Sequence, residues 1–507
     1  MSQLLAALAA PYGVLGDANV AIDDLTEDSR DVRPGSLFVA IPGTADDGHR
    51  YIADAVARGA SAVVVERAEL APEGVPVVVV PSSRKALAQF AERIYEHPAA
   101  GLDLIGFTGT FGKTTTSHVL QQLLNAAGRR TAVIGSLGAR FDGTSYELRG
   151  MTTPSAVMLQ RAMRRMKDAG ANAVVMEVTS HALMQDRVHG LRFSGGLIAA
   201  IRPGEHIDFH RDYDDYVDAK RRLLGYLEPG AILAYDADNR AAAMLARERD
   251  DVRDTGFSLR RTPIGGEAPE GERRQDNIGD RRLLSLADAV LDDRGAVFTV
   301  DGVQLRSALL GRANLRNVAL ALTFARAFGL RVEDARHALA GLTALRRRME
   351  RYDIAGRTVL DDTAGHPESF DATFEVADLI PAGRVVVAYA LRGSRGADIN
   401  RRNALSLAEH VQALGAHRLI VTEAADTARP HDRVTPEERD AAAEAFRERG
   451  VTPVWHETMK DAMTDAAAHT AAGDLIVLVG AQGMDSGREH LERALGTESR
   501  APRVERR

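Results

Sequence analysis

Short apolar runs alternate with longer helical patterns along nearly all of this 507-residue chain. Apolar runs bounded by Gly, Pro or charged residues are typical of buried strands, and helices between them are typical of crossover connections in parallel sheets. A single hydrophobic core rarely serves more than ~250–300 residues. The pattern therefore predicts an α/β protein with three domains.

The predicted strands fall into three blocks, which we assign to domains at residues 1–98, 99–344 and 345–507. A first helix is expected at the N-terminus and an amphipathic helix at Tyr51–Arg58. Two polar segments, 261–282 and 497–507, are expected to be irregular because they offer little apolar surface to bury. The predicted strands are Ser36–Ile41, Ala62–Val65, Val75–Val80, Leu104–Thr108, Thr131–Ile134, Ala173–Val178, Leu197–Ile201, Thr358–Leu360, Val385–Tyr389, Arg418–Thr422 and Leu475–Val479.

Composition narrows the possible functions. The formal net charge of −7 implies no broad attraction to nucleic acid or acidic lipid, and 5% aromatic residues are few for stacking single-stranded bases. The absence of cysteine excludes disulfides, thiolate metal sites and a cysteine nucleophile. No apolar run approaches the ~20 residues of a transmembrane helix, and the apolar N-terminus lacks the basic region of a secretory signal. We therefore predict a cytoplasmic enzyme that acts on small molecules and binds neither nucleic acid nor membrane.

One segment has the features of a phosphate-binding loop. The apolar strand Leu104–Thr108 continues through glycines into a helix that begins near Lys113. Glycines allow backbone N–H groups to surround phosphate oxygens, and the helix N-terminus adds the positive end of its dipole. Lys113 would reach the outer phosphates and Thr114 could bind Mg²⁺. The segment predicts nucleotide binding, although the common G-x-x-x-x-G-K-[ST] spacing is not kept, because Phe107 takes the place of its first Gly.

The loop at 108–115, Thr-Gly-Thr-Phe-Gly-Lys-Thr-Thr, resembles the ATP loop of the Mur ligase family, usually T-G-T-N-G-K-T-T, with Phe111 in place of Asn. The similarity is closest to the MurE type and covers residues 26–490. It implies an N-terminal UDP-binding α/β domain, a central P-loop ATPase-like parallel-sheet domain and a C-terminal Rossmann-like α/β domain. It also implies that ATP is bound by Gly109, Thr110, Gly112, Lys113, Thr114 and Thr115.

Three further stretches point to metal and phosphate chemistry. Glu177 ends an apolar strand, where ligand-binding carboxylates of open α/β sheets commonly lie. Its surroundings resemble the family's M-E-V-S-S-H-A-L, whose Glu holds Mg²⁺. The segment at 205–210 resembles D-H-L-D-Y-H, which implies a metal role for His206. Lys220 resembles the lysine of A-Y-x-x-A-K, which is often carbamylated and then acts as an acidic metal ligand.

The resemblance thus implies catalytic roles for Lys113, Glu177, His206 and Lys220, and Mg²⁺ ligation by Thr114, Glu177, His206 and Lys220. Asn314 lies in a stretch similar to G-x-F-N-x-x-N, which implies contact with the nucleotide. Asp362 begins a stretch similar to D-Y-A-H-T-P and is assigned to the same nucleotide site.

The first domain resembles the part of the family that binds a UDP-muramoyl-dipeptide donor. Residues 28–40 are close to the family's D-S-R-x-V-x-P-G-x-L-F-V-A, and this similarity implies that Ser29 and the loop around His49 contact the uridine. Residues that hold the sugar-peptide part in relatives are also present. They are Thr152, Thr153, Thr179, Gln185 and Arg187.

The acceptor region departs from the family pattern. Relatives that select meso-diaminopimelate carry D-N-P-R after a strand, whereas the strand at 419–422 is followed here by Glu-Ala-Ala-Asp-Thr-Ala-Arg. Arg395 is retained from G-G-D-R-D as a candidate clamp on the acceptor carboxylate, and Asp485 retains the acidity of G-K-G-H-E. A site that lacks polar contacts for a substrate does not select it strongly. The acceptor amino acid therefore stays open.

The sequence predicts an ATP-dependent amide ligase that joins a carboxylate donor to an amino acid through an acyl phosphate. Two alternatives stay open because of the departures at Phe111, Ile201, Thr363 and Gly365. One is a Mur-type ligase recruited to make a specialised metabolite or unusual peptide. The other is a degenerate nucleotide-binding protein that pairs with a partner.

Overall fold

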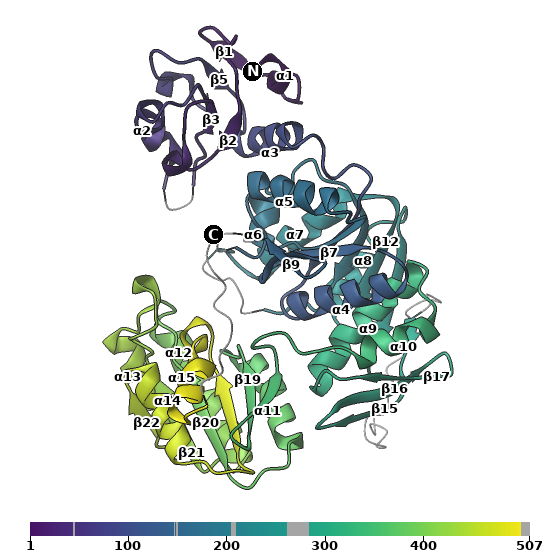
Figure 1. Ribbon diagram of the computed structural model, residues 1–507, viewed down its shortest axis with the longest axis vertical. Helices are drawn as coiled ribbons and strands as arrows, with labels where there is room; N and C mark the ends of the chain where they lie inside the picture. The colour runs from purple at the N-terminus through teal and green to yellow at the C-terminus, as the bar shows by residue number, and fades with distance from the viewer. Residues whose placement is uncertain (44–45, 147, 149–150, 204–208, 261–282, 498–507) are drawn as a thin grey trace. The chain divides into compact units, whose positions relative to one another are not determined.

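The computed structural model describes residues 1–43, 46–146, 148, 151–203, 209–260 and 283–497 (Figure 1). The chain divides into two compact units, which we describe separately. The first unit contains a five-stranded and a nine-stranded sheet, and the second contains a three-stranded and a six-stranded sheet. The polar segment 261–282 lies outside the described residues.

The five-stranded sheet is built from the first hundred residues. Its order is β1 (Gly13–Leu15), β5 (Val77–Val79), β4 (Ala62–Val65), β3 (Ser36–Val39) and β2 (Asp24–Thr26), with only β1 antiparallel to its neighbour. Three helices accompany it: α1 (Ser2–Leu5), α2 (Ile52–Ala57) and α3 (Ser83–Ile94). Helix α3 buries Leu87 and Phe90, spaced to lie on one face. The predicted strands and helices of this region are confirmed, within a few residues at their ends.

The nine-stranded sheet forms the centre of the first unit. Its order is β14 (Leu283–Ser285), β13 (Arg253–Ser258), β12 (Leu227–Asp236), β11 (Phe193–Ile198), β6 (Asp103–Thr108), β10 (Ala173–Glu177), β7 (Thr131–Gly135), β8 (Gly138–Phe141) and β9 (Thr144–Tyr146). All neighbours from β14 to β7 run parallel. The carboxyl ends of β6, β10 and β7 are therefore adjacent, which is where open α/β sheets bind ligands.

Helices of the first unit connect these strands, and Figure 1 shows α4 and α5 beside the nine-stranded sheet. They are α4 (Lys113–Ala126), α5 (Ala156–Asp168), α6 (Ser180–Met184), α7 (Tyr213–Arg221) and α8 (Arg240–Ala246), whereas α10 (Ala335–Ala340) comes after the three-stranded sheet in the chain. Helix α9 (Gly311–Ala327) follows the three-stranded sheet in the chain.

The strand predicted at Leu197–Ile201 is wrong in its bounds, because β11 begins at Phe193 and ends at Ile198. Gly195 and Gly196 occupy the part of the strand that the prediction missed. A Cβ at Gly195 would lie 2.4 Å from the ring of Phe324, and one at Gly196 would lie 3.0 Å from Leu227. Close packing therefore requires glycine here, and glycine conceals the apolar run of a buried strand.

The second unit holds two sheets. The antiparallel sheet is β15 (Ala287–Asp292), β16 (Gly295–Val300) and β17 (Val303–Ser307). The larger sheet has the order β18 (Glu350–Ile354), β19 (Arg357–Asp362), β23 (Leu475–Val479), β20 (Val385–Ala390), β21 (Arg418–Thr422) and β22 (Val454–His456), parallel except for β18. Its helices are α11 (Pro367–Leu379), α12 (Ala397–Ala413), α13 (Pro436–Glu448), α14 (Met459–Ala468) and α15 (Gly487–Ala494). The predicted strands of this region are confirmed.

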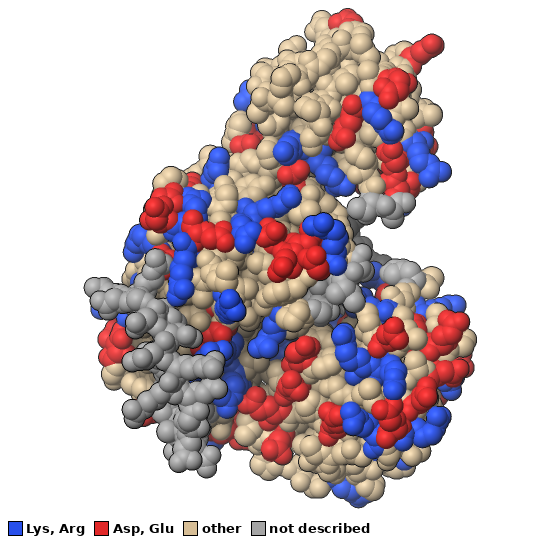
Figure 2. Space-filling model, turned by 180° about the vertical axis from the view of Figure 1, so that it is seen from behind, with Lys and Arg blue, Asp and Glu red and all other residues tan. Residues whose placement is uncertain are grey.

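Charges of both signs are interspersed on the face of the molecule shown in Figure 2. This distribution agrees with the small formal net charge of −7 and offers no extended cationic surface on that face. Within the described ranges, no helix has both the length and the apolar character to cross a bilayer.

Candidate active site

The predicted phosphate loop connects β6 to α4, at the carboxyl end of the sheet's central strand. Gly109 and Gly112 adopt φ angles of +152° and +80°, which disfavour other residues. A Cβ at Gly109 would lie 2.7 Å from Ala199, and one at Gly112 would lie 2.2 Å from Asn317. Both glycines are thus needed for the backbone path into the helix. Thr114 and Thr115, in the first turn of α4, are buried.

Two lysine ammonium groups converge on this loop. Lys113 Nζ donates to the carbonyl oxygens of Gly109 (2.9 Å) and Thr110 (3.0 Å). Lys220, which is 2% exposed on α7, also donates to Gly109 O at 2.9 Å, and its ammonium lies 4.3 Å from the centre of the Tyr216 ring. The Lys113 ammonium beside this glycine loop suits a polyanion such as the triphosphate of ATP, and the contact of Lys220 with Gly109 places the end of its side chain at the same loop.

Glu177 connects the phosphate loop to the neighbouring strand ends. Its side chain is 1% exposed and accepts hydrogen bonds from Thr114 Oγ1 (3.2 Å) and Ser136 N (3.0 Å). Ser136 follows β7, and its hydroxyl lies 2.9 Å from that of Thr152. A Cβ at Gly135 would lie 2.0 Å from Glu177 Oε1, so this carboxylate fits only against glycine. Ser136 was missed from the sequence, although its position after a strand of the same sheet was a usable signal.

The oxygens of Thr114 and Glu177 are the hard ligands that Mg²⁺ prefers, and their hydrogen bond shows that they approach each other. Within the described ranges, no group of three or more His, Asp or Glu side chains is arranged to hold a metal by itself. A metal here would therefore need phosphate oxygens or water to complete its ligands, as Mg²⁺ bound with ATP does. His206 lies outside the described residues.

A second histidine of the same stretch is placed by the structure. His210 is buried, with Nε2 3.0 Å from Ser180 Oγ and Nδ1 3.2 Å from Asp215. Thr110 Oγ1 lies 3.3 Å from the Tyr216 hydroxyl and accepts from Arg202 N. The two Thr110 contacts connect the phosphate loop to Tyr216 of α7 and to Arg202, which lies between β11 and α7.

The residues predicted to hold the sugar-peptide part lie together beside Glu177. Thr153 Oγ1 donates to the carbonyl of Glu177 at 2.9 Å and lies 3.2 Å from Thr179 Oγ1. The Arg187 guanidinium donates to Thr153 O at 2.7 Å and to Gln185 Oε1. Burial lowers the pKa of Arg187 from its ordinary value. This group and the phosphate loop share Glu177 as a common neighbour.

The two residues predicted at the uridine are both buried in the five-stranded sheet region. Ser29 begins the 3-10 turn Ser29–Asp31. The ring of His49 has Nδ1 2.7 Å from Asp47 Oδ1, while Nε2 accepts from Glu66 N at 3.2 Å. Both ring nitrogens of His49 are thus engaged within the domain. Through these two contacts the His49 ring holds the loop after β3 in place. A contact between His49 and the uridine stays a prediction.

The second unit contains the residues predicted for the nucleotide and the acceptor. Asn314 donates to Leu310 O at 2.9 Å. Asp362 accepts from Met349 N (3.0 Å) and from Thr373 Oγ1 (2.7 Å), so both of its oxygens have partners within the domain. Their contacts with the nucleotide stay predictions.

Asp485 is paired with a cation that was missed from the sequence. The Arg347 guanidinium is 4% exposed and contacts Asp485, Asp361 (2.9 Å) and the carbonyl of Ala481. Burial raises the pKa of Asp361 to about 6, although Arg347 acts in the opposite direction. The carboxylate of Asp485 is mostly exposed, so it is also accessible to a ligand. Arg347 lies within a run of three arginines, and the sequence alone does not show which of them is buried.

The loop that carries Arg395 is held by a buried carboxylate. Glu438, on α13, accepts from the backbone N–H groups of Ser394 (3.3 Å), Arg395 (2.8 Å) and Gly396 (2.8 Å). Burial raises the pKa of Glu438, but these N–H groups and that of Thr435 outweigh it, so the pKa lies below its ordinary value. The side chain of Arg395 is exposed.

Acidic residues after β21, where relatives carry D-N-P-R, have partners within the domain. Glu423 pairs with Arg439 at 2.8 Å. Asp426 accepts from Met459 N and Lys460 N at the start of α14. Between them, Ala424 is fully buried with φ +51°. After β21, the Asp426 carboxylate therefore caps helix α14, whereas the family pattern has polar residues there that contact the acceptor.

Comparisons with known proteins agree with this geometry. Three family models match in succession: the Mur ligase family, catalytic domain, at 21–95, the Mur ligase middle domain at 107–325, and the Mur ligase, glutamate ligase domain, at 347–482. They confirm the three α/β domains that the motifs predicted. The exact domain boundaries stay predictions.

Relatives match over nearly the whole chain. The UDP-N-acetylmuramoyl-L-alanyl-D-glutamate–2,6-diaminopimelate ligase of Geobacter sulfurreducens is 32% identical over 502 residues, which cover 94% of this chain and 92% of that protein. The ligase of the same name from Pseudomonas aeruginosa is 32% identical over 485 residues, covering 93% and 92%. The structure of MurF ligase from Thermotoga maritima in complex with ADP has a TM-score of 0.65 at 19% identity, covering 96% of this chain and 100% of that one, and shows the likeness of fold. The chain therefore belongs to the Mur ligase family, ATP-dependent enzymes that form C–N bonds.

Proposed function

We propose that this Mur ligase joins a UDP-N-acetylmuramoyl-dipeptide to the amino group of an amino acid, with ATP and Mg²⁺ as cofactors. The observation that carries the proposal is the hydrogen-bonded series from Thr114 through Glu177 and Ser136 to Thr152. It supports a phosphate site directly beside the donor site. Such a neighbourhood is what transfer of a phosphoryl group to a bound carboxylate requires.

The proposed reaction has two steps. An oxygen of the donor carboxylate attacks the γ-phosphorus of ATP, the bond to the bridging oxygen breaks, and ADP leaves. The unprotonated amine of the acceptor then attacks the acyl carbon of the acyl phosphate. Phosphate leaves with the electrons of the C–O bond, and the nitrogen loses a proton. The products are an amide, ADP and phosphate.

The residues of the phosphate loop would act mainly through charge. Lys113 offsets negative charge on the transferring phosphoryl group, and the loop N–H groups orient the triphosphate. Thr114, Glu177, His206 and a carbamylated Lys220 would hold Mg²⁺, which when bound supplies positive charge against phosphate oxygens. Arg395 and Asp485 would orient the acceptor. We place the reaction in the cytoplasm, where ATP is available, with small molecules as the only substrates.

The acceptor need not be the one in the relatives' names. Relatives are named for addition of 2,6-diaminopimelate, whereas Glu423 and Asp426 are occupied here by Arg439 and by the start of α14. We expect no preference for meso-diaminopimelate over amino acids that lack a second amino-acid head group. A preference requires polar contacts that only diaminopimelate makes.

The test is release of phosphate by the purified protein with ATP, Mg²⁺, UDP-N-acetylmuramoyl-L-alanyl-D-glutamate and a panel of amino acids. The panel includes alanine, glutamate, lysine and meso-diaminopimelate. The expected result is acceptor-dependent phosphate release, with kcat/KM for diaminopimelate no higher than for the best other acceptor. A preference for diaminopimelate of tenfold or more would contradict the acceptor prediction.

The same panel separates the alternatives. ATP binding without phosphate release for any acceptor would favour a nucleotide-binding partner protein. Turnover that requires a different carboxylate donor would favour a ligase of specialised metabolism. Small molecules that co-purify with the protein, identified by mass spectrometry, would name that donor.

A further inference from the structure

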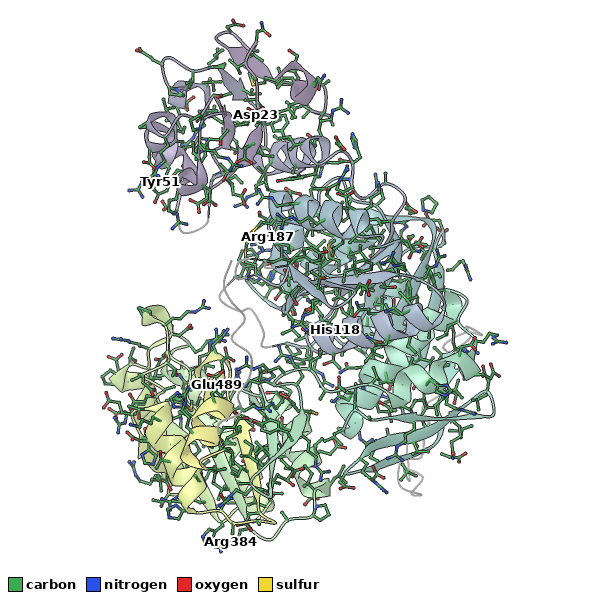
Figure 3. The ribbon with its side chains drawn as sticks, viewed as in Figure 1. Asp23, Tyr51, His118, Arg187, Arg384 and Glu489 are labelled. Carbon is green, nitrogen blue, oxygen red and sulfur yellow. The ribbon has the colours of Figure 1, made fainter. Side chains whose placement is uncertain are left out.

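Arg84, in the first turn of α3, is a half-buried cation to which no role has been assigned. Its guanidinium donates to the carbonyl of Pro42 at 2.9 Å, in the loop that follows β3. Within the described part of the chain, no carboxylate lies within 4.0 Å of the Arg84 guanidinium or of the Arg187 guanidinium. Figure 3 labels Arg187, which comes shortly after α6 in the chain.

The charge of Arg84 acts on Arg187 as a like charge. Burial lowers the pKa of both groups, and the charge of Arg84 lowers that of Arg187 further. The acidic groups that act in the opposite direction on these pKa values are Asp186 and Glu66 for Arg84, and Glu27 for Arg187. None of the three forms an ion pair with either arginine. An anion bound between the two guanidinium groups would relieve this repulsion and gain charge-assisted hydrogen bonds.

Neighbouring contacts connect Arg84 to both ends of the proposed donor site. Ser83, the preceding residue, donates from N and Oγ to Glu66 Oε1 at 2.8 Å, and Glu66 N donates to His49 Nε2 at 3.2 Å. On the other side, Arg187 is bonded to Thr153 at 2.7 Å. The helix that carries Arg84 thus contacts the predicted uridine loop through Ser83 and Glu66. The same helix packs through Leu87 in one buried cluster with Val157 of α5, the helix that follows the predicted sugar-peptide residues Thr152 and Thr153.

The parts of a nucleotide sugar follow one another in the order uridine, diphosphate and sugar. Its diphosphate lies between the uridine and the sugar, and it carries the negative charge that a pair of guanidinium groups recognises. We propose that Arg84, together with Arg187, binds the diphosphate of the nucleotide-sugar donor. The inference rests on the proposed donor, and it adds a binding residue that the family motifs in this sequence do not mark.

The test uses the full-length protein and UDP-N-acetylmuramoyl-L-alanyl-D-glutamate as the probe. Arg84→Ala is expected to raise the donor Kd and KM about 10- to 100-fold, the usual loss for hydrogen bonds to a charged group. Arg84→Lys keeps the charge and should lose less. The KM values for ATP and acceptor should not change. Arg93→Ala is the matched control, because Arg93 is an exposed arginine in the last turn of the same helix.

Thermal unfolding of the ligand-free proteins separates binding from structure. Arg84→Ala removes one hydrogen bond, to Pro42 O, and one like charge that acts on Arg187, so its Tm is expected to lie within a few degrees of that of wild type. A donor Kd for Arg84→Ala within twofold of wild type, or the same loss in Arg93→Ala, would overturn the inference. Should Arg84→Ala fail to fold, Arg84→Lys decides, with a Kd within twofold of wild type overturning the assignment. Wild-type protein that does not bind the donor at all would instead refute the proposed function.

Discussion

Replacing Lys113 with alanine should lower kcat about 10²- to 10³-fold, the range found when one group that stabilises transition-state charge is removed. Lys113 Nζ contacts the carbonyls of Gly109 and Thr110, so its ammonium is already at the loop that would cradle the triphosphate. Its charge is needed most when negative charge moves onto the transferring phosphoryl group. The measurement is phosphate release at saturating ATP, donor and acceptor.

Lys460→Ala is the matched control for this prediction, because Lys460 is an exposed lysine on α14. Its kcat should equal that of wild type. Thermal unfolding should show that Lys113→Ala remains folded. A folded Lys113→Ala protein that keeps more than a tenth of the wild-type kcat would refute the assignment of this loop to ATP.

Replacing Glu177 with glutamine should lower kcat about 10²-fold at a fixed, limiting Mg²⁺ concentration. The amide keeps the shape of the side chain and can still accept from Ser136 N, but it removes the negative charge beside Thr114. A loss of about 3 kcal/mol in transition-state stabilisation corresponds to this factor. The Mg²⁺ concentration that gives half the maximal rate should rise accordingly.

Gly135→Ala tests the same carboxylate without changing any charge. The added Cβ would lie 2.0 Å from Glu177 Oε1, so the carboxylate must move away from Thr114. Gly225→Ala is the control, since a Cβ there meets nothing within 4 Å and its φ is ordinary. Unchanged Mg²⁺ dependence in both Glu177→Gln and Gly135→Ala would show that Glu177 does not act at the metal.

Much of this site was predictable because it is local in sequence. The strand, glycines and helix of the phosphate loop are contiguous, and Glu177 ends a strand that pairs directly with β6. Parallel pairing brings strand ends to one edge, so a carboxylate at one end and a loop at the next are neighbours. The strands predicted from apolar runs were also found in the structure. Each of these strands is buried along most of its length, so its apolar residues are contiguous in the sequence.

Residues that depend on distant segments were not predictable. The role of Arg84 depends on Arg187, and the role of Glu438 depends on its contacts with the backbone of residues 394–396. In both cases the partners lie far apart in the sequence. Asp485 was assigned to the acceptor by its motif, whereas its partner Arg347 is revealed only by the fold. The three-stranded sheet β15–β17 was missed as well, because β15 and β17 bury only part of their residues and contain no long continuous apolar run.

Transfer of ¹⁸O tests the central claim, amide formation through an acyl phosphate, most directly. The donor is labelled with ¹⁸O in both oxygens of the reacting carboxylate, and the released phosphate is analysed by mass spectrometry. The account predicts one ¹⁸O atom in phosphate for each amide formed, because the oxygen that attacks the γ-phosphorus leaves with it. Amide formation accompanied by unlabelled phosphate would contradict the account.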